Sequence, residues 1–282
     1  MEQDPTLAAV KTYDYLRLAL AALVPLLFVS VAIEVSRAGC GLQPSISAYY
    51  YTPVHAVFIG VLVSMGVCLI ALKGNTDGED VLLNLAGMLA PGVAFIPTSG
   101  AGSCPSSALL APDVAAFVAN SMPALFLAGL VVGVLAVVIA RRESGTRGIG
   151  STNRRGILLS VAVLGGGSVW FFLDRGSFIA RGHDAAAIPM FLAIIAVVWI
   201  NARDVNAAVK QGAMPSSRNR FVPIYRSIAV AMLLALVGTV AISLATGSTS
   251  VVFWVEVVLI SLFAVFWVVQ TVELWKRGLR RT

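Results

Sequence analysis

Long apolar runs alternate with short polar or glycine-rich segments along the whole chain. Most runs are close to the roughly 20 residues that a helix needs to cross a bilayer. Backbone polar groups in lipid must be satisfied within the segment, so such runs are expected to be helices. The pattern predicts a single all-α domain, a polytopic transmembrane helix bundle over residues 1–282 with about eight spans. The runs are 16–35, 53–72, 81–97, 113–140, 156–173, 185–200, 227–246 and 251–274.

The composition is typical of a membrane protein. Hydrophobic residues make up 58% of the chain and charged residues only 12%, whereas a soluble domain carries about 25% charged residues. The net charge of +6 resides mainly in short loops between apolar runs, where positive charge orients a membrane protein. We therefore expect the lipid bilayer as a partner, and no nucleic acid.

The distribution of positive charge predicts an orientation, because basic loops stay on the cytoplasmic side. With eight spans, all of the 20 Lys and Arg residues except Arg37, Arg175 and Arg181 fall on the side of the two chain ends. We expect a multi-pass protein of the plasma (inner) membrane with both termini cytoplasmic. Residues 141–156 and 201–226 would be its basic cytoplasmic loops.

The stretch 44–60, between the first two spans, combines polar and aromatic side chains. The consecutive tyrosines Tyr49, Tyr50 and Tyr51 precede a Thr-Pro pair and His55. Threonine caps helices and proline is tolerated at the first helical position, so the pair predicts a helix start. Tyrosine rings are favoured at the membrane–water boundary. The segment is either an aromatic belt with a capped helix or the rim of a polar site.

Glu256 stands between two valines, more than one turn inside the last apolar run. A charged residue at a helix centre costs about 2.5–3.5 kcal/mol on insertion scales. Glutamate is too short to carry its charge far toward the interface. We therefore predict that it points into the bundle and pairs with another segment. The candidate partners are His55, Arg175, His183 and the tyrosine hydroxyls.

Several polar residues gather near the predicted outer surface and form the candidate ligand-binding set. They are Tyr49, Tyr50, Tyr51, His55, Arg175, His183, Asp184 and Glu256. His183 and Asp184 could be a metal-ligand pair, a general base with its orienting acid, or an interfacial helix cap. The chain has only two histidines, so a zinc site would need carboxylates from other spans. We predict no metal and no cofactor, and we assign no catalytic residue.

The cysteines divide between loops and a span. Cys40 and Cys104 lie in glycine-containing loops on the predicted outer side, which is the oxidising one. They are therefore expected to form a disulfide. Cys68 lies within the second span.

Two further patterns predict local packing. Gly60, Ser64 and Cys68 are spaced by four on the second span, and small residues at that spacing let helices approach closely. Glu273 is followed three and four residues later by Lys276 and Arg277. Residues at this spacing are neighbours on a helix surface, so we expect Glu273 to pair with them.

Four segments carry a family resemblance: S-x-S-x-Y-Y-Y-T from Ser45, E-D-x-L-L-N-L-A-G from Glu79, H-D-A-A-A-x-x-M-F from His183, and F-W-x-E ending at Glu256. In their order the sequence resembles a family of bacterial multispanning membrane proteins to which no activity is attached. A looser likeness is to the superfamily of alkaline ceramidases and progestin/adiponectin-type receptors. Their late H-x-x-x-H pair is absent here, so no catalytic residue is carried over.

Three functional hypotheses fit these observations. The first is a membrane protein whose outward-facing polar pocket binds a small molecule or lipid headgroup, as a sensor, carrier or accessory subunit. The second is an outward-facing membrane hydrolase with a His/Asp/Glu site formed by His55, His183, Asp184 and Glu256. The third is a structural membrane subunit without a pocket. Convergence of those side chains would favour the first two, and their dispersal the third.

Overall fold

The computed structural model describes residues 5–39, 41–98, 113–144, 151–246 and 250–280. This part of the chain is all-α, as predicted, and contains eight α-helices and two short 3-10 helices. They are α1 (Pro5–Ala38), η1 (Ser47–Tyr51), α2 (His55–Ala71), α3 (Asp77–Phe95), α4 (Val114–Ser144), α5 (Ser151–Leu173), α6 (Arg175–Lys210), η3 (Ser216–Arg220), α7 (Phe221–Thr246) and α8 (Ser250–Leu274).

Six of these helices are long and apolar enough to cross a membrane: α1, α4, α5, α6, α7 and α8. The chain is therefore a multispanning membrane protein. The two remaining α-helices are shorter or more polar. Apolar α2 has 17 residues, and α3 carries three acidic residues in its first turn.

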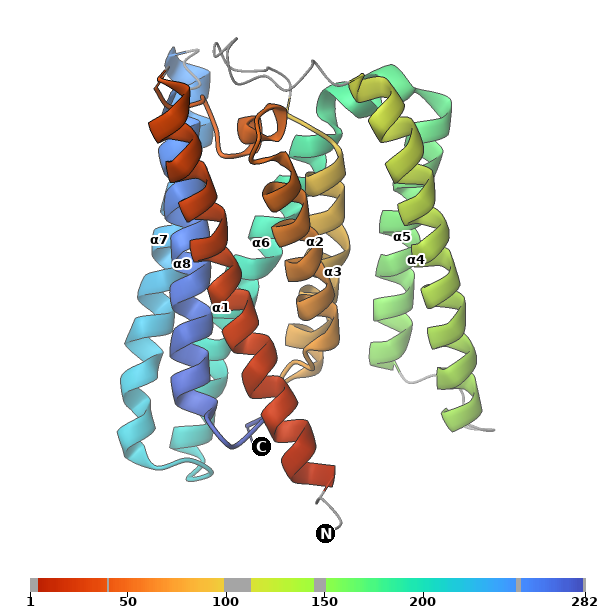
Figure 1. The fold of residues 1–282 in the computed structure, drawn as a ribbon. Helices are drawn as coiled ribbons and strands as arrows, with labels where there is room; N and C mark the ends of the chain where they lie inside the picture. The colour runs from red at the N-terminus through yellow and green to blue at the C-terminus, as the bar shows by residue number, and fades with distance from the viewer. Residues whose placement is uncertain (1–4, 40, 99–112, 145–150, 247–249, 281–282) are drawn as a thin grey trace.

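Six helices form a closed ring around a shared apolar core (Figure 1). Each packs against the next in the order α1, α2, α3, α6, α7 and α8, and α8 returns to α1. Side chains from all six meet inside the ring, among them Leu20, Phe58, Leu83, Val198, Met232 and Phe266. Segments from both halves of the chain therefore build one interior.

The two ends of the ring differ in charge. One end holds the start of α1, the turn at 72–76, η3 and segment 275–280 (Figure 1). We call it the basic end, because it carries Lys73, Arg218, Arg220, Lys276 and Arg277. The opposite end holds η1 and the starts of α2 and α6, and we call it the η1 end (Figure 1).

Helices α4 and α5 form a hairpin beside the ring, against α3 (Figure 1). Toward the basic end a groove of about 1080 Å³ separates the hairpin from Asp80 and Asn84 of α3. In the 18-residue apolar stretch of α4 only 6% is buried, and the value for α5 is the same. The corresponding stretch of α6 is 50% buried. The hairpin thus offers most of its apolar surface to lipid.

Helix α6 extends well beyond the apolar run 185–200 at both of its ends. Asp174 caps its start by accepting a hydrogen bond from the Ser177 N–H (2.9 Å). Positions 182, 183, 186 and 190 are buried, whereas Arg181 and Asp184 are exposed. Buried positions recur every three or four residues here, as on one face of a helix. The polar residues 174–184, which precede the apolar run 185–200, therefore form the cap and the first turns of α6. At the other end α6 continues to Lys210 and α7 begins at Phe221, so much of 201–226 is helical.

The close approach of α2 to α3 uses a different glycine from the one predicted. A Cβ on Gly66 would lie 2.7 Å from the carbonyl oxygen of Gly87, so neither position has room for a side chain. Gly60 meets nothing within 4 Å, and both Gly60 and Ser64 are exposed. Gly60 and Ser64 of the predicted stripe therefore face outward, while Cys68 is half-buried against the core. The contact face of α2 is set by its larger buried residues Phe58, Val61, Met65 and Leu69.

Candidate functional site

The segment before α2 folds inward and closes the η1 end of the ring. The N–H of Phe253 on α8 donates to the Pro44 carbonyl (3.1 Å), which ties this segment to the last helix. Tyr49 and Tyr50 are only 1% and 2% exposed and belong to the core. The expected aromatic belt is therefore wrong for these two residues, since the 3-10 turn η1 directs their rings inward. The predicted helix start at the Thr-Pro pair is wrong by two residues, because α2 begins at His55 and has no side-chain cap. Thr52 instead accepts a hydrogen bond from the Val54 N–H (3.2 Å) in the turn before the helix.

Glu256 points into the bundle, as predicted from the cost of placing it in lipid. Its Oε2 accepts the N–H groups of Ile46 and Ser47, and its Oε1 lies 3.1 Å from Ser47 Oγ. The neighbouring α8 residues Trp254 and Val258 are exposed. The direct partners are thus Ile46 and Ser47 of the 44–60 stretch, and neither was among the predicted partners of Glu256.

His183 joins this contact from α6. Its Nε2 lies 3.0 Å from Ser47 Oγ, and its Nδ1 lies 2.8 Å from the Ile96 carbonyl oxygen after α3. A carbonyl oxygen only accepts, so Nδ1 carries a hydrogen and donates it. Ser47 therefore connects Glu256 with His183, and the predicted pair is linked through one hydroxyl and not by direct contact.

Glu256, Ser47 and His183 form a chain of two hydrogen bonds. Counting donors and acceptors shows that both hydrogen bonds can form with the protons in either of two arrangements. In one, protonated Glu256 donates to Ser47, whose hydroxyl donates to a neutral His183. In the other, ionised Glu256 accepts from Ser47, and the His183 imidazolium donates from both ring nitrogens. Each arrangement contains one proton more than the state in which Glu256 is ionised and His183 is neutral. The chain can therefore pass one proton between the acid and the imidazole.

A cavity of about 60 Å³ lies inside the ring, with Ser47 and Glu256 at its polar end. Its other walls are apolar and come from α1, α2, α3, α6 and α8. They include Leu27, Phe58, Met65, Ala187, Met190 and Phe263. An apolar lining with a few convergent polar groups is typical of small-molecule sites, but this cavity is smaller than the roughly 300–1,000 Å³ of pockets for drug-sized ligands, so it has room only for a very small molecule.

The other predicted residues lie near this cluster but outside it. The His55 ring nitrogen Nδ1 lies 2.7 Å from the Tyr50 carbonyl oxygen, and the ring packs edge-on against Tyr50. Tyr51 donates to the Thr98 carbonyl (3.0 Å). Arg175 lies over the ring of Phe171 and is exposed, as is Asp184.

The tyrosine hydroxyls support the fold of this end. The Tyr49 hydroxyl accepts the N–H of Gln43 (3.3 Å). Burial, with a smaller contribution from Tyr51, raises the pKa of Tyr50 to about 12, so its hydroxyl stays neutral. Among the described residues, no tyrosine hydroxyl contacts Glu256, and the predicted tyrosine network around that acid is not formed.

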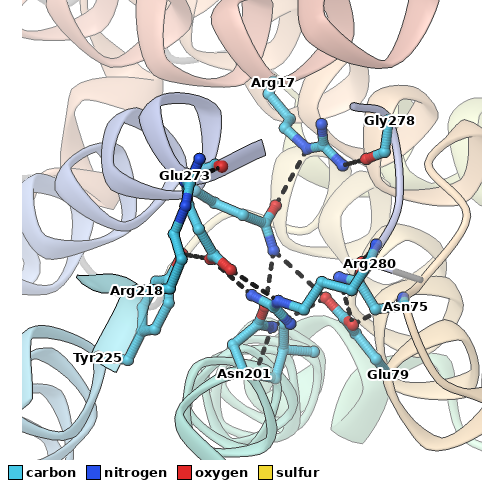
Figure 2. A network of polar contacts seen from close by, with 11 residues as sticks. Arg17, Asn75, Glu79, Asn201, Arg218, Tyr225, Glu273, Gly278 and Arg280 are labelled. Atoms are coloured by element: carbon cyan, nitrogen blue, oxygen red, sulfur yellow. Dashed lines mark hydrogen bonds and ion pairs between the residues drawn. The ribbon is translucent and has the colours of Figure 1, made fainter. Parts of the chain in front are cut away.

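A second and larger polar network fills the basic end of the ring (Figure 2). Buried Glu79 accepts the main-chain and side-chain N–H groups of Asn75 (2.8 and 3.0 Å) and the Asn201 amide (2.8 Å). Gln270 donates to Asn201 Oδ1 (2.9 Å) and lies 3.4 Å from Glu79 Oε1. Arg17 in turn donates to Gln270 Oε1 (3.2 Å). Helices α1, α3, α6 and α8 are thereby joined.

Arg280 completes the network from the segment after α8. Its Nε donates to Glu273 Oε1 (2.8 Å), and its Nη2 donates to Glu273 Oε2 (2.7 Å) and Asn201 Oδ1 (2.7 Å). Burial alone lowers the pKa of Arg280, but the hydrogen bonds and charge of Glu273 outweigh it and raise the pKa. The predicted pairing of Glu273 with Lys276 and Arg277 is wrong, because both basic residues are exposed beyond the helix end.

Two predictions concern residues or ligands that the structure does not display. Cys40 and Cys104 both lie outside the described residues, so their disulfide stays a prediction, while Cys68 is free in α2. Within the ranges described, no three His, Cys, Asp or Glu side chains form a cluster that could hold a metal ion.

Comparison of the chain with protein-family models, with curated proteins and with solved structures finds no match.

Proposed function

We propose that this protein binds a small molecule with a hydrogen-bonding head and an apolar body in the cavity of the ring. Ser47 and Glu256 would hold the head, and the apolar walls would hold the body. The Glu256–Ser47–His183 chain would exchange one proton with the bound molecule, as suits a sensor or a carrier. The observation that supports this proposal is the placement of these two polar side chains at one end of an otherwise apolar cavity.

A hydrolase fits the same contacts less well. The Ser47–His183 distance of 3.0 Å suits a serine nucleophile and its base. However, the N–H groups of Ile46 and Ser47, which could stabilise an oxyanion, both donate to Glu256. Asp184 is exposed and His55 contacts Tyr50, so the predicted His/Asp/Glu set does not assemble.

The family resemblance is retained within this proposal. Each of its four segments supplies one residue to a polar site of the ring. Ser47, His183 and Glu256 belong to the η1 end, and Glu79 belongs to the basic end. We infer that both sites serve the function that the resembling family shares.

Ligand entry is tested with primary alcohols from ethanol to butanol, which carry a hydroxyl head on a short apolar body. The alcohol that best fits the cavity should raise the unfolding temperature in detergent by about 3 °C at tenfold excess over its Kd. Ala187→Leu fills the cavity and should abolish the effect, because Ala187 lines it. Ala185→Leu is the matched control, because Ala185 is exposed on the same helix. Equal alcohol effects in both variants would refute binding in the cavity.

We further propose eight spans in the plasma membrane, with both termini and the basic end cytoplasmic. Support comes from the basic residues at that end and the few at the η1 end. Reporter fusions after Arg142 and after Arg280 should behave as cytoplasmic, and a fusion within residues 99–107 as external. A cytoplasmic signal from the last fusion would contradict this orientation and would place the η1 end, with the polar end of the cavity, on the cytoplasmic side.

A further inference from the structure

The segment after α8 turns back beneath the ring and carries Arg280 into it. Two residues of this turn have left-handed backbones, Lys276 at φ 60° and Gly278 at φ 71°. The Lys276 N–H donates to Asp14 Oδ2 (3.0 Å), and Arg17 Nη2 donates to the Gly278 carbonyl (2.6 Å). The Arg280 N–H donates to Asn75 Oδ1 (2.8 Å). The segment is thus attached to the ring mainly by polar contacts.

The guanidinium of Arg280 occupies a shaped polar site (Figure 2). It meets both oxygens of Glu273 in the forked geometry that guanidinium groups form with carboxylates. Nη2 also reaches Asn201, whereas Nη1 is buried without a partner in the part of the chain that is described. The side chain is only 1% exposed.

The residues around this guanidinium are held by contacts that do not involve Arg280. Tyr225 donates to Glu273 Oε2, and Arg218 donates to the Glu273 carbonyl. The Asn201 amide donates to Glu79 and to the Val197 carbonyl (2.9 Å), and its oxygen accepts from Gln270. Such contacts keep the acceptors in place when the guanidinium leaves. A buried Glu273 would then lack its cation, which is strongly unfavourable.

We propose that the basic end carries a binding site for the guanidinium group of a small molecule, and that Arg280 is its tethered occupant. Withdrawal of segment 275–280 exposes the Glu273–Asn201 fork to a free ligand of the same chemistry. A short flexible tether alone would give an effective concentration in the millimolar range, and the further hydrogen bonds of this segment raise it above that. A free guanidinium compound at millimolar concentration therefore does not displace Arg280 from the wild type. The segment therefore acts as an internal competitor for the site.

The test uses Arg280→Ala with methylguanidinium chloride as the probe. Thermal unfolding of the full chain in detergent should show a lower midpoint for the variant, and methylguanidinium should raise it by about 2–5 °C. Wild type should not respond at the same concentration. Ethylammonium, a cation without the fork, should have a smaller effect. Arg277→Ala is the matched control, because Arg277 is exposed in the same segment.

The proposal also requires the response to depend on the carboxylate of Glu273. Methylguanidinium should not stabilise the double variant Arg280→Ala/Glu273→Gln. If Arg280→Ala does not accumulate as folded protein, Arg280→Val keeps part of the apolar stem without a tethered cation and is tested in the same way. A midpoint that does not move in the variant used, or that moves equally in the double variant, overturns the proposal.

Discussion

Replacing Glu79 with alanine should lower the free energy of unfolding by about 3–5 kcal/mol, as expected for removal of one member of a buried charged network. Glu79 is 1% exposed and accepts hydrogen bonds from Asn75 and Asn201, with Gln270 nearby. Alanine would leave buried donors unsatisfied and would remove a negative charge close to Arg280. Equilibrium unfolding in mixed micelles, followed by far-UV circular dichroism, measures the loss.

Asp77→Ala is the control for this change. Asp77 is an exposed acid in the same first turn of α3. Because its side chain is exposed to water, its interactions, the one with the helix dipole included, are worth about 1 kcal/mol or less. If Glu79→Ala were no less stable than Asp77→Ala, the network at the basic end would contribute nothing to the stability of the ring.

The helices could be predicted where apolar runs set their limits. The run 251–274 matches α8 to within one residue, because its residues are apolar on nearly every face. Helix α6 was underestimated, since Arg181 and Asp184 lower the hydropathy of its first turns while facing outward. There the burial of every third or fourth residue, and not the mean hydropathy, identifies the helix.

The basic-end network could not be predicted, because its members are far apart in the sequence. Arg17 reaches Gln270 across 253 positions, and Asn201 reaches Glu79 across 122. No local period connects such residues. Gln270 did provide a signal, since it interrupts the last apolar run as Glu256 does. Its partners depend on the order of helices around the ring, which the sequence pattern does not determine.

The η1-end site was partly predicted. The direction of Glu256 was predicted correctly from the free-energy cost of a charge in lipid. That cost depends on this one side chain alone, so it can be judged without knowing the fold. The partner was missed because Ile46 and Ser47 act partly through main-chain N–H groups, which any residue except proline can supply. The identity of residues 46 and 47 thus gave little indication of these contacts.

Replacing Glu256 with alanine should lower the free energy of unfolding by about 2–4 kcal/mol, whereas glutamine should cost less than about 1 kcal/mol. Alanine leaves the N–H groups of Ile46 and Ser47 without their acceptor. The glutamine amide oxygen can accept both, and its NH₂ can donate to Ser47 Oγ. Ser47 then donates to neutral His183, as in the form with protonated Glu256. Equilibrium unfolding in mixed micelles measures both variants.

A double-mutant cycle tests whether the contact is direct. Ser47→Ala removes the hydroxyl that joins Glu256 to His183 but keeps the Ser47 N–H. Combined with Glu256→Ala, it should give a coupling free energy of about 0.5–3 kcal/mol, as found for residues in contact. Additive losses in the cycle would show that the hydroxyl and the carboxylate act independently. A glutamine variant as unstable as the alanine variant would show that the site requires the ionised acid, and the neutral form of the proton chain would have to be abandoned.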